Sequence, residues 1–220
     1  MTIVIAICGT MGSGKTTAVE NIAAALPDCV TMHEDDYNKT TERSLDEIDH
    51  WWNRGANVGE FDLSTLIQQL AIVCQESATS KVGAAMYQGT DVPRSPRHSR
   101  TGNGQIVLLE THFGRLHPEL NSWIDFQCWI DVPADIAVAR KIAQLSNQMQ
   151  NSQSDDFAHD GLRWIENFCK GYLRTTRKLF EMQRQQVRDL SDMSIDGQAT
   201  PLDVCADFLR NLPQAYKPHF

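Results

Sequence analysis

The segment 9–16 constrains the fold most strongly, because it matches the phosphate-loop pattern G-x-x-x-x-G-K-[ST] at every fixed position. A β-branched run at 3–7 precedes it and predicts a buried strand. Residues 17–26 follow with apolar residues at helical spacing, which predicts a helix. A strand, a glycine-rich turn and a helix form the setting in which backbone N–H groups converge on phosphate oxygens.

The loop therefore predicts binding of a nucleoside triphosphate together with Mg²⁺. Lys15 can reach the β- and γ-phosphates, and the Thr16 hydroxyl can bind the metal ion. A chance match in a Gly/Ser-rich turn is the alternative, but a simple turn gives no reason for these two residues. The predicted nucleotide-binding residues are Gly9, Thr10, Met11, Gly12, Ser13, Gly14, Lys15, Thr16 and Thr17.

Length and charge exclude several classes of protein. A chain of 220 residues fits a single domain over 1–220, with a small attached lid. The net charge of −8 argues against general binding to nucleic acid or to a membrane surface, and leaves a small-molecule substrate as the expected partner. The six cysteines form no C-x-x-C pair, and no apolar run is long enough to span a membrane, so we expect a reduced, cytoplasmic protein. The oligomeric state stays open, a homodimer included.

Acidic residues follow the second predicted strand, at 29–32. That strand completes a βαβ unit, and we expect it to pair in parallel with the first strand. His33-Glu34-Asp35-Asp36-Tyr37 comes next, where open parallel sheets bind their ligands. An acid placed there can accept the proton of a hydroxyl that attacks a γ-phosphate. A solvated acidic loop is the alternative.

A second carboxylate ends the apolar run 105–110. A buried parallel strand of this kind would deliver Glu110 to the Mg²⁺ side of the site, although Glu110 could instead cap the next turn. Another apolar run at 123–132 predicts a further core strand, and 194–197 a final edge strand. The fold class is therefore α/β, as a three-layer α/β/α sandwich around a parallel sheet of roughly five strands.

Helical patterns and irregular stretches complete the chain. Helices are expected over 44–53, 63–75, 161–188 and 204–212. Trp51 and Trp52 in the first of them are either core residues or a wall for a flat ring. We expect an inserted loop at about 83–104 and a lid at about 140–160, the latter containing a polar linker at 146–160.

The phosphate loop followed by an acidic-aromatic D-D-[FY] resembles the uridine kinase and nicotinamide riboside kinase group of phosphate-loop kinases, over roughly residues 2–180. The resemblance implies ATP as the phosphoryl donor and a catalytic base in the acid before the aromatic. Asp36 aligns with that base, and the metal ligands would be Thr16, Glu110 and Asp36. The family has Glu-Gly at the third strand, where this chain has Glu110-Thr111.

The resemblance also implies residues on the acceptor side. The segment 57–63 is similar to one whose acidic residue faces ribose hydroxyls, although Asp62 also suits a helix N-cap. Tyr87 and His98-Ser99-Arg100 of the inserted loop are similar to residues of a family hairpin that contacts the base; a disordered basic loop is the alternative. The expected substrate-binding residues are Asp35, Tyr37, Glu60, Asp62, Tyr87, His98 and Arg100.

Catalysis is assigned to Asp36, Lys15 and Arg140. The family carries paired arginines in its lid, where this chain has Arg140-Lys141, and Arg140 would stabilise the transferring phosphoryl group. We predict a kinase that transfers the γ-phosphate of ATP to a hydroxyl of a nucleoside such as uridine, cytidine or nicotinamide riboside. Pantothenate or a sugar-like alcohol is an alternative acceptor. A non-catalytic ATP-binding regulatory module is the alternative of another class. The small number of arginines in the lid favours it, and Asp36 disfavours it, because a protein that only binds ATP needs no base.

Overall fold

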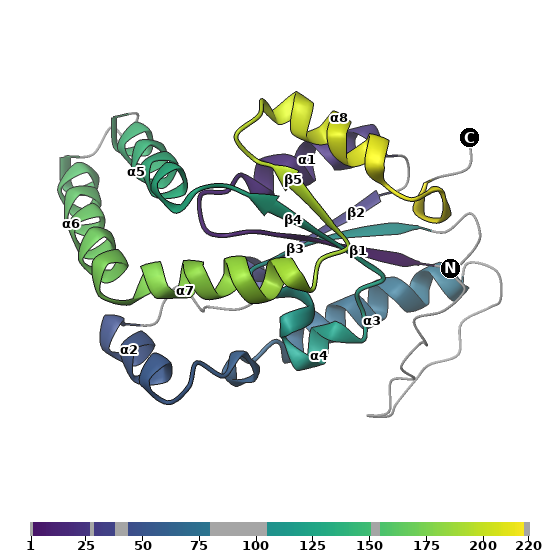
Figure 1. Ribbon diagram of the computed structural model, residues 1–220, viewed down its shortest axis with the longest axis horizontal. Helices are drawn as coiled ribbons and strands as arrows, with labels where there is room; N and C mark the ends of the chain where they lie inside the picture. The colour runs from purple at the N-terminus through teal and green to yellow at the C-terminus, as the bar shows by residue number, and fades with distance from the viewer. Residues whose placement is uncertain (1, 27–28, 38–43, 80–104, 151–154, 218–220) are drawn as a thin grey trace.

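A five-stranded, all-parallel sheet in the order β2-β3-β1-β4-β5 forms the centre of the molecule (Figure 1). The computed structural model describes residues 2–26, 29–37, 44–79, 105–150 and 155–217. The strands are β1 (Ile3–Cys8), β2 (Cys29–His33), β3 (Ile106–Thr111), β4 (Phe126–Asp131) and β5 (Met193–Asp196). The predicted α/β class and the parallel sheet are confirmed.

The expected pairing of the first two strands is wrong, because β3 lies between them. Ile106 is aligned with Ile3 on one side and with Cys29 on the other. The burial of the strands explains this order. β3 is almost wholly buried, as an interior strand must be, whereas β2 is half exposed and suits an edge.

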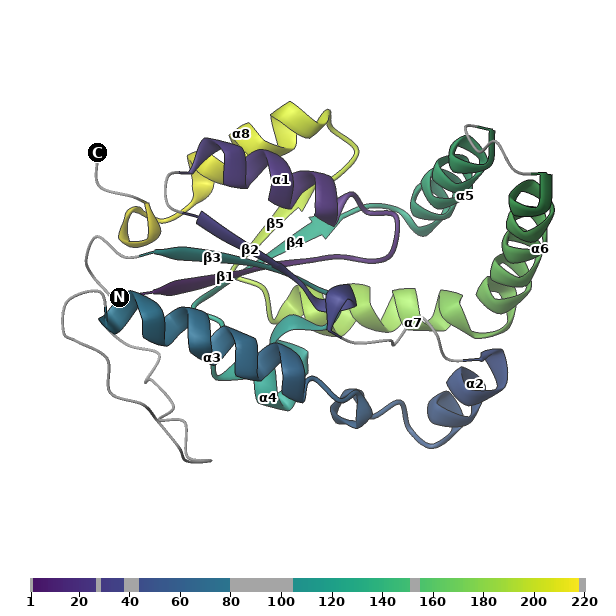
Figure 2. The ribbon, with the colours of Figure 1, turned by 180° about the vertical axis from the view of Figure 1, so that it is seen from behind.

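Two hydrophobic layers cover the sheet, and the alternation of side chains along β1 separates them. Ile5 and its neighbours on one face pack with α1 (Lys15–Ala25) and α8 (Pro201–Asn211). Ala6 and its neighbours on the other face pack with α3 (Ser64–Thr79) and α4 (Pro118–Asn121). Figures 1 and 2 show these helices on opposite sides of the sheet, so the three-layer sandwich is confirmed.

The remaining helices gather beyond the carboxyl ends of the strands. They are α2 (Leu45–Asn53), α5 (Ala134–Gln150) and α6 (Asp155–Gly171), which continues through a π-helical turn, Tyr172–Thr176, into α7 (Arg177–Met182) and a second π-helical turn, Gln183–Val187. In Figure 1, α5 and α6 stand side by side at the left, away from the sheet.

The polar linker expected at 146–160 is wrong where the structure describes it, because 146–150 and 155–160 are helical. Polar composition suggested a loop, but glutamine is a good helix former and α5 and α6 pack against each other. The inserted loop expected at 83–104 lies outside the described residues.

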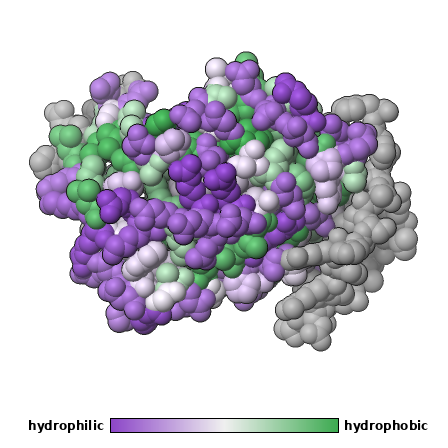
Figure 3. All heavy atoms as spheres, viewed as in Figure 1, coloured by the Kyte–Doolittle hydropathy of each residue, from purple (hydrophilic) through white to green (hydrophobic). Residues whose placement is uncertain are grey.

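The surface at the α5–α6 end carries hydrophobic side chains (Figure 3). Leu162 and Trp164 of α6 are among the exposed large hydrophobic residues. Within the described ranges, no helix is both long and apolar enough to cross a membrane.

Candidate active site

The phosphate loop connects β1 to α1, and its glycines meet two separate demands. Gly12 and Gly14 have φ angles of 79° and 92°, which side-chain-bearing residues rarely adopt. A Cβ atom on Gly12 would also lie 2.1 Å from the carbonyl oxygen of Ala137 in α5. The loop thus packs directly against α5, while Gly14 is the N-cap of α1.

Buried polar atoms without a protein partner line this loop. The hydroxyls of Thr10 and Ser13 are buried and make no hydrogen bond in the structure. Lys15 is only 5% exposed, and its Nζ donates to the carbonyl oxygen of Thr10 at 3.2 Å. Buried polar groups require partners, so these donors and the start of α1 fit an anion such as a phosphate.

Burial lowers the pKa of the Lys15 ammonium, and nearby carboxylates oppose that change. Glu110 contributes most to the opposition, followed by Asp35. The two acids thus favour the charged form of Lys15, and phosphate oxygens would add to that stabilisation.

Thr16 and Glu110 form the side of the loop that suits a metal ion. Thr16 Oγ1 donates to Glu110 Oε1 at 3.0 Å, and Glu110 Oε2 lies 2.6 Å from His33 Nδ1. No cluster of three or more His, Cys, Asp or Glu that could hold a metal exists in the described part of the chain. The residues still fit Mg²⁺, which typically takes one or two protein oxygens and completes its shell with phosphate oxygens and water.

The ends of β2 and β3 are tied together by a buried acid. Glu34 is 2% exposed and accepts hydrogen bonds from Thr111 Oγ1 at 2.5 Å and from the His112 N–H at 3.0 Å. The Thr111 hydroxyl also accepts from the N–H groups of Phe113 and Gly114. Thr111 is fully buried, so its hydroxyl holds the turn together.

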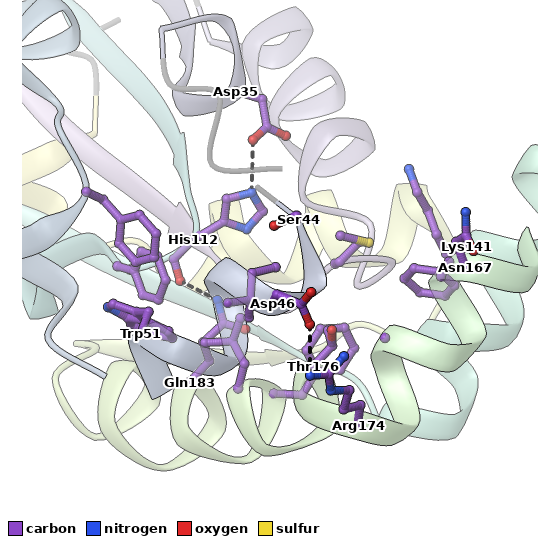
Figure 4. A pocket seen from close by; sticks show the side chains of 18 of the residues that line it. Asp35, Ser44, Asp46, Trp51, His112, Lys141, Asn167, Arg174, Thr176 and Gln183 are labelled. Atoms are coloured by element: carbon purple, nitrogen blue, oxygen red, sulfur yellow. Dashed lines mark hydrogen bonds and ion pairs between the residues drawn. The ribbon is translucent and has the colours of Figure 1, made fainter. Parts of the chain in front are cut away.

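Of the two adjacent aspartates, Asp35 lines a large cavity beside the loop, whereas Asp36 lines neither cavity described here. Asp35 Oδ1 lies 3.1 Å from His112 Nε2 (Figure 4). That hydrogen bond is the main cause of a lowered pKa for Asp35, and the charges of Lys15 and Lys141 lower it further. Asp36 is exposed on the same short 3₁₀ turn, Glu34–Asp36.

The large cavity measures about 920 Å³ and has aromatic walls. Phe61 and Phe113 stack with ring centroids 5.1 Å apart and an interplanar angle of 15°. Trp51 is 1% exposed and donates from Nε1 to the carbonyl oxygen of Asn57, so it is both a core residue and a wall of the cavity. Figure 4 shows polar side chains among these rings, namely Asp35, Ser44, Asp46, His112, Lys141, Asn167, Arg174, Thr176 and Gln183.

Arg174 lines the large cavity and is paired with acids of α2. Arg174 lies in the first π-helical turn and forms ion pairs with Asp46, at 2.9 Å, and with Asp49. Both acids belong to α2, so the pairs hold that helix against the long helix that follows α6. π-Helical turns of this kind are frequent at functional sites.

Arg140 and Lys141 contribute to different cavities. Arg140 donates from an Nη atom to the carbonyl oxygen of Gly197 at 2.8 Å and lines a smaller cavity of about 270 Å³, together with Thr17 of the loop. Lys141 lines the large cavity that contains Asp35. The arginine expected to act on the transferring phosphoryl group therefore lines a different cavity from Asp35.

The other predicted acceptor residues lie elsewhere. Glu60 pairs with Arg54 at 2.6 Å, and Asp62 accepts the Ser64 N–H at 2.9 Å, as a helix cap does. Neither of these acids lines the two cavities, and Tyr37 packs against the core under α3. Tyr87, His98 and Arg100 fall outside the described residues.

The site residues to which the sequence predictions assigned no role include His33, His112, Lys141 and Gln183. The two histidines could have been found, because each lies at the carboxyl end of a predicted strand beside a candidate acid. Lys141 is the neighbour of Arg140 in the lid pair that the resemblance marked, and Gln183 belongs to no recognisable motif. Only the tertiary structure brings them to the cavity.

Comparisons with known proteins find kinases among the similar sequences and structures. The uridine kinase of Borrelia hermsii is 24% identical over 213 residues, covering 95% of each chain. The uridine kinase of Brevibacillus brevis is 27% identical over 150 residues, covering 64% of this chain and 65% of the relative. Among solved structures, the shikimate kinase of Aquifex aeolicus superposes with a TM-score of 0.46 at 15% identity, covering 96% of both chains.

A family model supplies the remaining observation. The model for the phosphoribulokinase/uridine kinase family matches residues 4–148, which contain the phosphate loop, the acidic turn and Glu110. The chain therefore belongs to the phosphoribulokinase/uridine kinase family and is a small-molecule kinase.

Proposed function

We propose that this kinase transfers the γ-phosphoryl group of ATP to a hydroxyl of a nucleoside-like acceptor such as uridine, cytidine or nicotinamide riboside. The observation that carries the proposal is the position of Asp35. It lines an aromatic-walled cavity, and its charge acts on Lys15 of the phosphate loop. Flat rings suit walls of this kind, and the uridine kinases among the relatives support the same class of acceptor.

Asp35, in place of Asp36, is the proposed general base. The acceptor oxygen forms a bond to the γ-phosphorus as the bond from that phosphorus to the oxygen leaving with ADP breaks. The hydroxyl proton passes to Asp35, whose lowered pKa keeps it ionised and able to accept at neutral pH. Lys15 stabilises the negative charge on the phosphate oxygens. Lys141 takes the role that the sequence suggested for Arg140, because it lines the acceptor cavity.

The nucleotide is proposed to lie along the loop, with its phosphates on the N–H groups at the start of α1. Its nucleoside end would occupy the smaller cavity, which Arg140 and Gly197 help to line. Thr16 and Glu110 would hold Mg²⁺, which when bound neutralises charge on the phosphates. A cytoplasmic location is part of the proposal, because the reaction consumes ATP and all six cysteines are free thiols.

The test is phosphoryl transfer from ATP and Mg²⁺ to a panel of nucleosides, nicotinamide riboside, pantothenate and sugar alcohols. Wild type is compared with Lys15→Ala and Asp35→Asn, and Asp36→Asn serves as the matched control. We expect transfer to a nucleoside-like acceptor, a loss of at least about 100-fold in the first two variants, and near wild-type rates in the control.

Two results would contradict the proposal. Exclusive transfer to pantothenate or a sugar alcohol would overturn the acceptor class. Full activity of Asp35→Asn, with loss in Asp36→Asn, would restore the base that the sequence suggested. If ATP binds and no acceptor on the panel is phosphorylated, the result favours the regulatory module.

A further inference from the structure

We infer that His112 is a positioning residue for the reaction: its Nε2–H holds one oxygen of the Asp35 carboxylate, so that the other oxygen meets the acceptor hydroxyl. The inference rests on the proposed function, which makes Asp35 the base. It adds a residue that no motif in the sequence marks.

Asp35 needs such a partner because its own surroundings do little to fix it. It lies on the short 3₁₀ turn Glu34–Asp36, and its side chain is 54% exposed. An exposed carboxylate rotates freely about its side-chain bonds, and each orientation other than the productive one lowers the rate. His112 is the less mobile member of the pair, with a side chain only 15% exposed.

The main chain of His112 is held on both sides. Its N–H donates to the buried carboxylate of Glu34 at 3.0 Å, and its carbonyl oxygen accepts from Gln183 Nε2 at 3.1 Å. Its ring also meets the ring of Phe113 edge-on, with centroids 6.5 Å apart. A side chain on such a fixed backbone can impose a direction on the carboxylate that it contacts.

The hydrogen-bonding capacity of the two groups decides which one donates. An ionised carboxylate only accepts hydrogen bonds, so the proton must be on His112 Nε2. The bond occupies Oδ1 of Asp35 and leaves Oδ2 for the acceptor. Figure 4 shows one oxygen of Asp35 joined to the His112 ring, while the other oxygen points away from that ring.

The strand register shows that this pair is half of a crossed arrangement. His33 of β2 is the register partner of Glu110 of β3, and their side chains are 2.6 Å apart. Two residues farther along the chain from each of these positions lie Asp35, after the end of β2, and His112, after the end of β3. Each strand end therefore supplies a histidine that holds the carboxylate of the other, which fixes the base relative to the metal-side acid.

The experiment replaces His112 with a ring that cannot donate and with an amide that can. For whichever of uridine, cytidine and nicotinamide riboside the wild type phosphorylates, His112→Phe should lower kcat about 10- to 100-fold, with the KM for ATP within about twofold of wild type. His112→Gln keeps an N–H donor near Nε2 and should recover most of that loss. His50→Phe, an exposed histidine of α2 outside both cavities, is the matched control.

A double variant separates positioning from a merely structural role. In the Asp35→Asn background, His112→Phe should cause less than about a threefold further loss, since it acts through Asp35. An equal loss in both backgrounds, or no rescue by glutamine, would overturn the inference. Full activity of His112→Phe would also overturn it while leaving the proposed function intact. If Asp35→Asn alone is fully active, or the wild type phosphorylates none of the three acceptors, the proposed function fails and the inference with it.

Discussion

Arg140 and Lys141 are neighbours in the sequence, yet they line two different cavities beside the phosphate loop. Arg140 reaches the carbonyl oxygen of Gly197 beyond β5, and Lys141 lines the cavity that contains Asp35. Consecutive residues of a helix point about 100° apart, so a helix that packs on the loop can supply one cation to each side. The two substitutions should therefore have different kinetic effects.

We expect Arg140→Ala to raise the KM for ATP about 10-fold with little change in kcat, because it lines the proposed nucleoside site. Lys141→Ala should instead lower kcat by about 10-fold or more, because its charge lies on the acceptor side. Steady-state kinetics with each substrate varied separates the two effects. The assignment fails if Arg140→Ala lowers kcat while Lys141→Ala affects only the KM for ATP.

Gly12→Ala should abolish ATP binding and destabilise the fold. The new Cβ would lie 2.1 Å from the carbonyl oxygen of Ala137 at a φ of 79°, at a cost of about 1–3 kcal/mol in the free energy of unfolding. Urea unfolding and calorimetric titration with ATP measure the two effects. Gly55→Ala is the control, since Gly55 also has a positive φ but nothing within 4 Å of an added Cβ. Retained ATP binding by Gly12→Ala would contradict the packing of the loop on α5.

Glu110→Gln should raise the Mg²⁺ concentration required for half-maximal rate by at least about 10-fold, because the metal loses a charged ligand. Removal of Mg²⁺ with EDTA should stop transfer, and added Mg²⁺ should restore it. Direct Mn²⁺ binding in the presence of ATP gives a readout independent of the rate. Glu20→Gln on the exposed face of α1 should leave both measurements unchanged. Unaltered metal dependence of Glu110→Gln would remove this residue from the metal site.

Thr111→Val should destabilise the protein by about 1–3 kcal/mol, because buried Glu34 loses a donor and two backbone N–H groups lose their acceptor. The free energy of unfolding in urea measures the loss. Thr31→Val, on the exposed part of β2, is the matched control and should change stability by less than about 0.5 kcal/mol. Equal stability of the two variants would show that the hydroxyl of Thr111 is dispensable.

Cys29 should react slowly with alkylating reagents. Burial raises the pKa of its thiol to about 11 from a usual value near 9, so the reactive thiolate is about 100-fold scarcer at neutral pH. Because the folded-state pKa is raised, the alkylation rate should keep rising about tenfold per pH unit between pH 9 and 11. Mass spectrometry of the labelled Cys29 peptide, with urea-unfolded protein as the control, follows this rate. A plateau near pH 9 would show an unperturbed thiol.

The acidic turn shows where prediction from sequence stops. The motif D-D-[FY] located the turn and predicted Asp36 as the base, which stays a prediction, whereas Asp35 is the aspartate that lines the cavity. The choice depends on how a 3₁₀ turn directs consecutive side chains, and the buried bond from Thr111 to Glu34 sets that turn. The pairing of β2 with β3 was also not predictable from a local pattern, because strand order depends on which strands are buried on both faces.

The sequence by itself determined the phosphate loop, the α/β class and the Thr16–Glu110 side of the site, because glycine spacing and continuous apolar runs act over short stretches of chain. Only the tertiary structure decided which acid lines the large cavity, which cavity Arg140 and Lys141 each line, and that His33 and His112 contact the two carboxylates. The two histidine–carboxylate contacts join strand ends that lie 77 residues apart in the chain, and the cavities of Arg140 and Lys141 depend on how α5 packs on the loop, so no local pattern encodes either feature.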